Sequence, residues 1–208
     1  MGNIKSELPE TSDKLFIEES DTKKGAWISN PTNKFFLYSE GYREAGNKLY
    51  DYCIENPFFS NTLIYPIIYN YRQFLELRLK ELIIMGNQYI DTDDDFPDEH
   101  SLTTLWNIYR NKLLPNIDNT IEKDTLDNVE NLINEFNTVD PKSMSFRYPV
   151  TKGPKREKSI KMPTIDIENF KKSLNKLMYF FDWQWDMISH YKDLKQEMLS
   201  EWYGEYQN

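Results

Sequence analysis

Residues 64–86 read IYPIIYNYRQFLELRLKELIIMG, and this stretch decides the fold. At about 100° per residue, one helix face collects six apolar side chains: Ile64, Ile68, Leu75, Leu79, Leu82 and Ile83. Nearly opposite lies a second apolar set, Ile67, Phe74 and Met85. A helix that is apolar on two sides is buried between neighbouring helices. The stretch therefore predicts the central helix of a bundle, over about 60–86, with Pro66 in its first turns.

The same three- and four-residue spacing of apolar side chains recurs along the chain. It predicts further helices over about 36–55, 99–114, 121–137 and 166–202. The helix over about 99–114, the third along the chain, is predicted to be capped by Asp98 or Glu99 and to end before Pro115. The predicted fold class is all-α, a helical bundle of about five main helices with little strand. A long irregular loop, residues 138–165, separates the fourth helix from the last, and Phe146 to Val150 within it are predicted to be extended.

The predicted domain organisation is an N-terminal arm, residues 1–34, followed by a single helical-bundle domain, residues 35–208. The arm is polar and irregular apart from two apolar clusters, Leu15 to Ile17 and Ala26 to Ile28, by which we expect it to dock.

Composition excludes several classes of protein. The chain of 208 residues carries a formal net charge of -9, which disfavours bulk DNA binding. A single cysteine, Cys53, excludes an intrachain disulfide and fits a reducing compartment. The sequence lacks an apolar run of about 18 residues, so we expect no membrane-spanning helix. These features predict a cytoplasmic protein.

Arg72, Glu76 and Lys80 stand four residues apart in the central helix. Arg72 falls inside the apolar arc, Glu76 lies at its edge, and Lys80 lies outside it. A guanidinium at that position requires partners, because an unpaired buried charge costs several kcal/mol, on the order of 3–5. Two interpretations stay open: a buried structural network, or a site in which Arg72 and Glu76 bind a ligand such as a phosphate.

His100 follows an acidic loop and precedes the third helix. It is interpreted either as a packing or capping residue, or as a general acid or base. The candidate catalytic residues are therefore His100, Arg72 and Glu76, and the same three are candidates for ligand binding.

The long loop carries a compact basic and aromatic motif, Arg147 and Tyr148, followed by Lys152, Lys155 and Arg156. The loop is either a solvated segment or a strap that contacts phosphates. In the second case all five are ligand-binding residues, and Tyr148 stacks on a base of single-stranded RNA.

We expect no metal site and no cofactor. The acidic run at Asp91, Asp93, Asp94 and Asp95 departs from a calcium-binding EF-hand loop, because Phe96 stands where glycine is needed. Two histidines and one cysteine cannot supply a Cys/His zinc site.

Two motifs resemble bacterial HEPN-type helical proteins. The first is YRxxLELxLKxLI, which runs here from Tyr71 to Ile83, and the second is HxLxxLW, from His100 to Trp106. The segment FRYP, Phe146 to Pro149, is also similar to relatives of that group. The resemblance covers about residues 36–150.

The resemblance implies a helical bundle, often dimeric, associated with toxin–antitoxin, phage-defence and RNA-processing systems. Many members are metal-independent ribonucleases in which an arginine precedes a histidine by four to six residues. Neither His100 nor His190 has an arginine at that spacing. We therefore expect a non-catalytic or atypical binding or regulatory protein that engages RNA, a nucleotide, a protein partner or a second copy of itself. The alternatives are a ribonuclease assembled from Arg72, His100 and Arg147, and a structural dimerisation protein.

Overall fold

The computed structural model describes residues 8–21, 23–28, 35–92 and 95–205. It divides the chain into two compact units, Met1–Thr32 and Asn33–Asn208. The described residues of the first unit form turns and bends. The expected docking of the arm stays a prediction.

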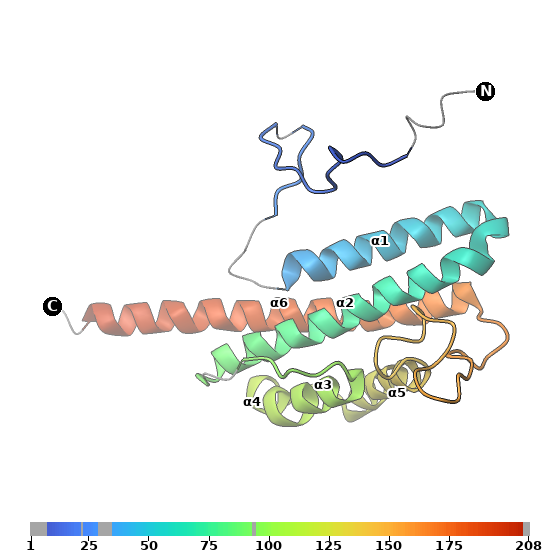
Figure 1. The fold of residues 1–208 in the computed structure, drawn as a ribbon. Helices are drawn as coiled ribbons and strands as arrows, with labels where there is room; N and C mark the ends of the chain where they lie inside the picture. Colours follow the sequence, from blue (N-terminus) through green and yellow to red (C-terminus); the bar gives the residue numbers. More distant parts are fainter. Residues whose placement is uncertain (1–7, 22, 29–34, 93–94, 206–208) are drawn as a thin grey trace, which may run out of the picture. The chain divides into compact units, whose positions relative to one another are not determined.

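The second unit is an all-α bundle, as the periodicity predicted (Figure 1). Its main helices are α1 (Phe36–Glu55), α2 (Ser60–Tyr89), α3 (Leu102–Ile108), α5 (Lys123–Val139) and α6 (Ile167–Glu205). A short 3-10 turn, η2 (Pro57–Phe59), joins α1 to α2. In the described part of the chain, β-structure is limited to one isolated antiparallel bridge between Val150 and Lys158.

Helix α2 is the centre of the bundle, in contact with α1, α3 and α6 (Figure 1). Both predicted apolar faces are buried: Leu75 and Leu79 on one, Ile67 and Phe74 on the other, are all fully enclosed. Pro66 is accommodated inside the helix, in its second turn. The two-sided pattern of residues 64–86 is explained by these neighbours, because each face of α2 meets a different part of the bundle.

The third predicted helix differs from the structure in two respects. Its cap is Ser101, whose Oγ accepts a hydrogen bond from the Thr104 N–H at 3.2 Å, so the prediction of Asp98 or Glu99 is wrong. Glu99 instead accepts from the N–H groups of His100 and Ser101, ahead of the helix. The chain also continues through Pro115: a π turn, η3 (Tyr109–Leu113), leads into α4 (Leu114–Ile117), where the proline occupies the first turn and its missing N–H is tolerated.

The long loop, residues 140–166, is anchored by Phe146, which is buried. The N–H groups of Arg147 and Tyr148 both donate to the Met144 carbonyl at 3.1 Å, which makes this segment a turn. The prediction of an extended segment from Phe146 to Val150 is therefore wrong for Phe146 to Tyr148. Only Val150, in the isolated bridge, takes part in β-structure.

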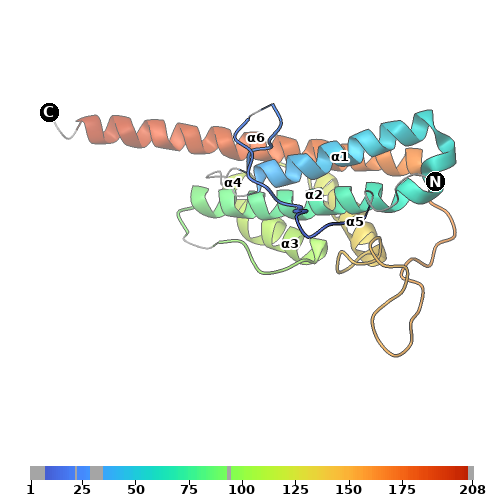
Figure 2. The same cartoon turned by 45° about the horizontal axis from the view of Figure 1, so that its top comes forward.

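Helix α6 is longer than predicted and extends past the end of α2, as two views of the bundle show (Figures 1 and 2). Its first half packs in the core through Leu174, Leu177 and Phe181. Cys53, from α1, also lies in this core. Within the described residues, every helix is too short or too polar to cross a membrane.

Candidate functional site

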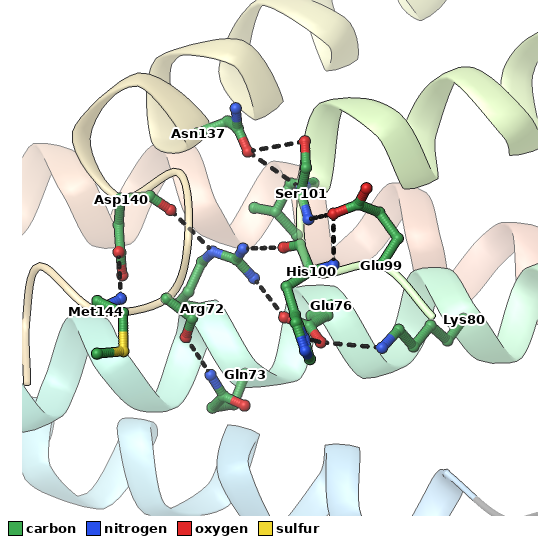
Figure 3. Close-up of polar contacts among 12 residues, drawn as sticks. Arg72, Gln73, Glu76, Lys80, Glu99, His100, Ser101, Asn137, Asp140 and Met144 are labelled. Carbon is green, nitrogen blue, oxygen red and sulfur yellow. Dashed lines mark hydrogen bonds and ion pairs between the residues drawn. The ribbon is translucent and has the colours of Figure 1, made fainter. Parts of the chain in front are cut away.

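Arg72 is enclosed completely, at the point where α2 meets the segment before α3 and the end of α5 (Figure 3). Its Nη1 donates to Glu76 Oε2 at 3.1 Å, its Nη2 to the His100 carbonyl oxygen, and its Nε to the Asp140 carbonyl at 3.5 Å. Burial lowers the pKa of the guanidinium, an effect that Glu76 and Asp140 oppose. Every branch of the guanidinium thus contacts a protein oxygen, which favours the structural interpretation of Arg72.

Glu76 is the shared acceptor of this network. Its Oε2 accepts from Arg72, and its Oε1 accepts from Lys80 Nζ at 3.1 Å and contacts His100 Nδ1 at 2.8 Å. Glu76 and Lys80 are both buried, so the expectation that Lys80 lies outside the core is wrong. The Lys80 ammonium lies 5.5 Å from the centre of the Phe96 ring, and this loop residue covers a helix face that the sequence pattern left open.

Asp140 fixes the start of the long loop against the same network. Its Oδ1 accepts from the N–H groups of Met144 and Ser145, at 2.7 and 2.9 Å. Gln73, which follows Arg72 in α2, donates from its side-chain amide to the hydroxyl of the buried Ser143 in the same loop. The cluster of Arg72, Glu76, His100 and Asp140 therefore joins three chain segments into one rigid corner of the bundle.

His100 is the one member of this cluster that faces solvent, with 66% of its side chain exposed. Its backbone is held by the carbonyl bond to Arg72 and by the N–H bond to Glu99 at 2.7 Å. Its ring is held through Nδ1 by Glu76 at 2.8 Å. An exposed histidine whose ring is oriented by a carboxylate is an arrangement suited to proton transfer.

Arg147 and Tyr148 lie elsewhere, in an open groove between the start of α2 and the long loop. Both side chains are exposed, and the Arg147 guanidinium lies 5.3 Å from the Tyr148 ring centre and 5.7 Å from that of Tyr69. The groove has a volume of about 980 Å³ and is also lined by Lys158 and Tyr65. The contacts of Arg147 run to Tyr69, Tyr148 and Met144, whereas those of His100 run to Glu76 and Arg72.

Lys152, Lys155 and Arg156 are exposed in the long loop. In the sequence they lie between Val150 and Lys158, which line the groove. Residues 146–161 carry six basic side chains and one acidic side chain, a formal charge of +5 in a chain whose net charge is -9. The sequence candidates thus form two groups: a buried cluster around Arg72 that includes His100, and an exposed basic segment that includes Arg147 and Tyr148.

A second buried ionic network was missed by the sequence analysis. Arg78 donates to Glu81 Oε2 at 2.9 Å, to Glu40 of α1, and to Asp182 of α6 at 3.4 Å, and Arg43 also binds Asp182 at 2.8 Å. Arg78 and Glu81 fall on the same face of α2 as Ile67, Phe74 and Met85, so their positions on that apolar face were the available signal.

A third cluster joins α1, α2 and α6 through Tyr71. The Tyr71 hydroxyl donates to Asn47 Oδ1 at 2.8 Å and accepts from Lys171 Nζ at 2.6 Å. Burial raises the pKa of Tyr71 and lowers the pKa of Lys171. The spacing of these three residues could not predict the contact, because they belong to three helices that are far apart in the sequence.

Within the described ranges, histidine, cysteine and carboxylate side chains form no group of three that is placed to hold a metal ion. Asp93 and Asp94 of the acidic run lie outside those ranges. No family model, curated protein or solved structure matches the chain. The HEPN-like resemblance therefore stays a prediction.

Proposed function

We propose that this protein is a non-catalytic, HEPN-like binding module that engages single-stranded RNA through its basic loop. The observation that carries the proposal is a groove lined by Arg147, Tyr148 and Lys158, which all belong to the segment of formal charge +5, residues 146–161. Cationic side chains that track a phosphate backbone, next to an aromatic ring on which a base stacks, are the usual elements of sequence-tolerant RNA binding.

The acidic remainder of the chain is compatible with such a site. At physiological ionic strength, exposed charges more than ~8 Å apart are largely screened from one another. The loop therefore acts by its own local charge. The net negative charge elsewhere disfavours coating of nucleic acid by the rest of the surface and confines binding to the loop.

The buried state of Arg72 supports a non-catalytic role. An arginine that stabilises charge on a scissile phosphate has to reach the RNA, whereas Arg72 is 0% exposed and its nitrogens contact Glu76, His100 and Asp140. The contacts of Arg147, the other candidate arginine, run to Tyr69, Tyr148 and Met144.

A second candidate function, a metal-independent ribonuclease, is favoured by one observation. His100 is exposed while Glu76 holds its Nδ1 at 2.8 Å, which is the geometry of an oriented general base. A cleavage assay on labelled total RNA without added metal decides between the two functions. We expect no cleavage, and cleavage that disappears in His100→Ala would replace our proposal with this one.

RNA binding is tested by titrating a single-stranded oligonucleotide at several salt concentrations. We expect the logarithm of the affinity to fall with the logarithm of the salt concentration, by about 0.7 for each phosphate that is neutralised. The triple variant Lys152→Gln, Lys155→Gln, Arg156→Gln should flatten this slope. Tyr148→Ala should weaken binding by ~1–3 kcal/mol if a base stacks on the ring.

The matched control is Lys48→Gln, Lys172→Gln, Lys176→Gln. These three lysines are exposed on α1 and α6, so this variant changes the net charge by the same amount at sites outside the loop. It should retain the wild-type slope. Equal slopes in the two triple variants, or an absence of binding at low salt, would contradict the proposed role of the loop.

A further inference from the structure

A hollow of about 270 Å³ lies between α5, the start of α6 and the long loop. We call it the α5–α6 pocket. Most of the side chains that line it are apolar, and they come from α2, α5, the loop and α6: Ile68, Leu132, Phe136, Val139, Phe146, Met162, Ile165, Phe170, Leu174 and Leu177. The pocket therefore joins segments that are far apart in the sequence around one apolar surface.

The floor of the α5–α6 pocket belongs to the core, whereas its walls reach the surface. Ile68, Leu174 and Leu177 are buried, and the half-buried rings of Phe136 and Phe170 lie with their centres 6.0 Å apart. Apolar side chains that line an open hollow stay in contact with water unless a ligand covers them. The volume is just below the ~300–1,000 Å³ of pockets for drug-sized molecules, so it suits a ligand of about one ring with a short side chain.

The charged groups of the α5–α6 pocket have a single sign. Glu135 of α5 and Asp166, directly before α6, line it, and every other lining side chain is uncharged. The Glu135 carboxylate is exposed and has no ion-pair partner among the described residues. Asp166 is also exposed, and its Oδ1 accepts from the Asn169 N–H at 2.9 Å. The pocket thus combines an apolar surface with a formal charge of -2, which complements a cation.

We propose that the α5–α6 pocket binds a small amine whose body is an apolar ring. The ammonium group pairs with Glu135 and Asp166, since charge-assisted hydrogen bonds to carboxylates are the strong ones. The ring packs against Phe136 and Phe170, as aromatic rings do in offset or edge-to-face pairs. An organic anion of the same size would meet two carboxylates and no cationic side chain, so the pocket selects against it.

The α5–α6 pocket is distinct from the groove proposed for RNA. The two share a wall formed by the loop residues Phe146, Met162, Thr164 and Ile165. The charged lining of the groove, however, is Arg147 and Lys158, and that of the pocket is two carboxylates. Phosphate is therefore attracted to the groove and repelled from the pocket, and the amine site stands whether or not the protein binds RNA.

Three compounds of similar size test the proposal: 2-phenylethylamine, the neutral 2-phenylethanol and the anion phenylacetate. Each is titrated against the full chain, and the methyl NMR signals of Ile68, Met162 and Ile165 report binding in the pocket. We expect 2-phenylethylamine to bind with a Kd on the order of 1 mM, as suits so small a ligand, 2-phenylethanol several-fold more weakly, and phenylacetate not at all. Unchanged methyl signals with the amine, or equal affinities for the amine and either other compound, would overturn the proposal.

Two variants separate charge from shape. Glu135→Gln should weaken the amine by about 2–5-fold, the range of an exposed ion pair, and leave 2-phenylethanol unchanged. The control Glu122→Gln changes an exposed residue 13 positions earlier, about 20 Å along α5, and should bind as the wild type does. Ser173→Leu fills the pocket from its wall and should abolish binding of both compounds without lowering the melting temperature. Binding that persisted in a folded Ser173→Leu, or an equal loss in the two glutamine variants, would refute this site.

Discussion

Arg72 is a fully buried cation whose three oxygen partners come from three different segments. Its removal leaves Glu76 inside the protein with a weaker set of donors. Breaking a buried charge network by deleting one partner costs about 3–5 kcal/mol. We therefore expect Arg72→Ala to lower the free energy of unfolding by that amount, measured by urea denaturation.

Two other variants, Arg147→Ala and Lys80→Ala, serve as controls for the stability of Arg72→Ala. Arg147→Ala removes an exposed guanidinium and should change stability by less than about 0.5 kcal/mol. Lys80→Ala should fall between the two, near 1–3 kcal/mol, because its ammonium is buried but donates to a single carboxylate. A stability of Arg72→Ala equal to that of Arg147→Ala would contradict the network described here.

The Glu99 carboxylate predicts a dependence of stability on pH. Hydrogen bonds from the N–H groups of Ser101 and His100 lower its pKa in the folded state. Because the folded pKa is depressed, the stabilisation is present above the ordinary glutamate pKa of about 4.3 and is lost as the pH falls through the folded value. Glu99→Gln should therefore melt below the wild type at pH 7, and the two should converge at acidic pH, below the folded-state pKa of Glu99.

The neighbouring carboxylate Asp98 supplies the control for this experiment, since it is exposed. Asp98→Asn should melt close to the wild type at both pH values. A deficit of Glu99→Gln that stayed constant with pH would show that the carboxylate charge is not the cause.

The position of a residue on a helix face determines whether its burial could be predicted from the sequence. The burial of Arg72 followed from its place inside the apolar arc of α2, and the burial of Arg78 would have followed from the opposite face. Lys80 was misjudged because Phe96, from a loop 16 positions further along the chain, covers it. Helix periodicity reports only local geometry, so contacts made by distant loops stay outside its reach.

At the scale of elements, the close approach of α1 to α2 is set by Gly46. A Cβ placed there would lie 2.9 Å from the ring of Tyr71, whose hydroxyl is held by Asn47 and Lys171. We expect Gly46→Ala to destabilise the protein, because overpacking costs typically ~1–3 kcal/mol and exceeds the gain in helix propensity. Thermal unfolding measures the difference.

Gly41 provides the matched substitution in the same helix. It is exposed, and an added Cβ meets no atom within 4 Å. Gly41→Ala should stabilise the protein by about 1 kcal/mol through helix propensity alone. Shifts of the same sign at both positions would show that the Gly46 contact does not set the distance between α1 and α2.

The bounds of α1 and the start of α2 match the sequence expectation, because Asn56 and Pro57 interrupt the helical pattern there. The π turn at Tyr109–Leu113 had no comparable signal. It arises where Tyr109 and Leu113 are both buried, so tertiary packing overrides the regular helix. The rigid corner at Asp140 was equally unpredictable, since it depends on hydrogen bonds to a loop.

For the whole molecule, the C-terminal part of α6, residues 192–203, contributes little to the stability of the bundle. Its side chains are largely exposed, so deletion of residues 197–208 should leave the melting temperature of a dilute sample within a few degrees of the wild type. Differential scanning calorimetry of the full-length and truncated chains measures the difference. A large fall in the melting temperature of the truncated chain would show that these residues contribute to the packing of the bundle.

The central position of α2 has a consequence for how the molecule opens. Residues such as Tyr71, Leu75 and Leu79 are sealed on every side by other helices, so their backbone amides exchange hydrogen with solvent only when the entire bundle unfolds. The exposed basic loop and the tip of α6 exchange through local fluctuations. The slowest amides in α2 should therefore report the global free energy of unfolding directly, and any ligand or partner that binds the folded chain should slow them, wherever on the surface it attaches.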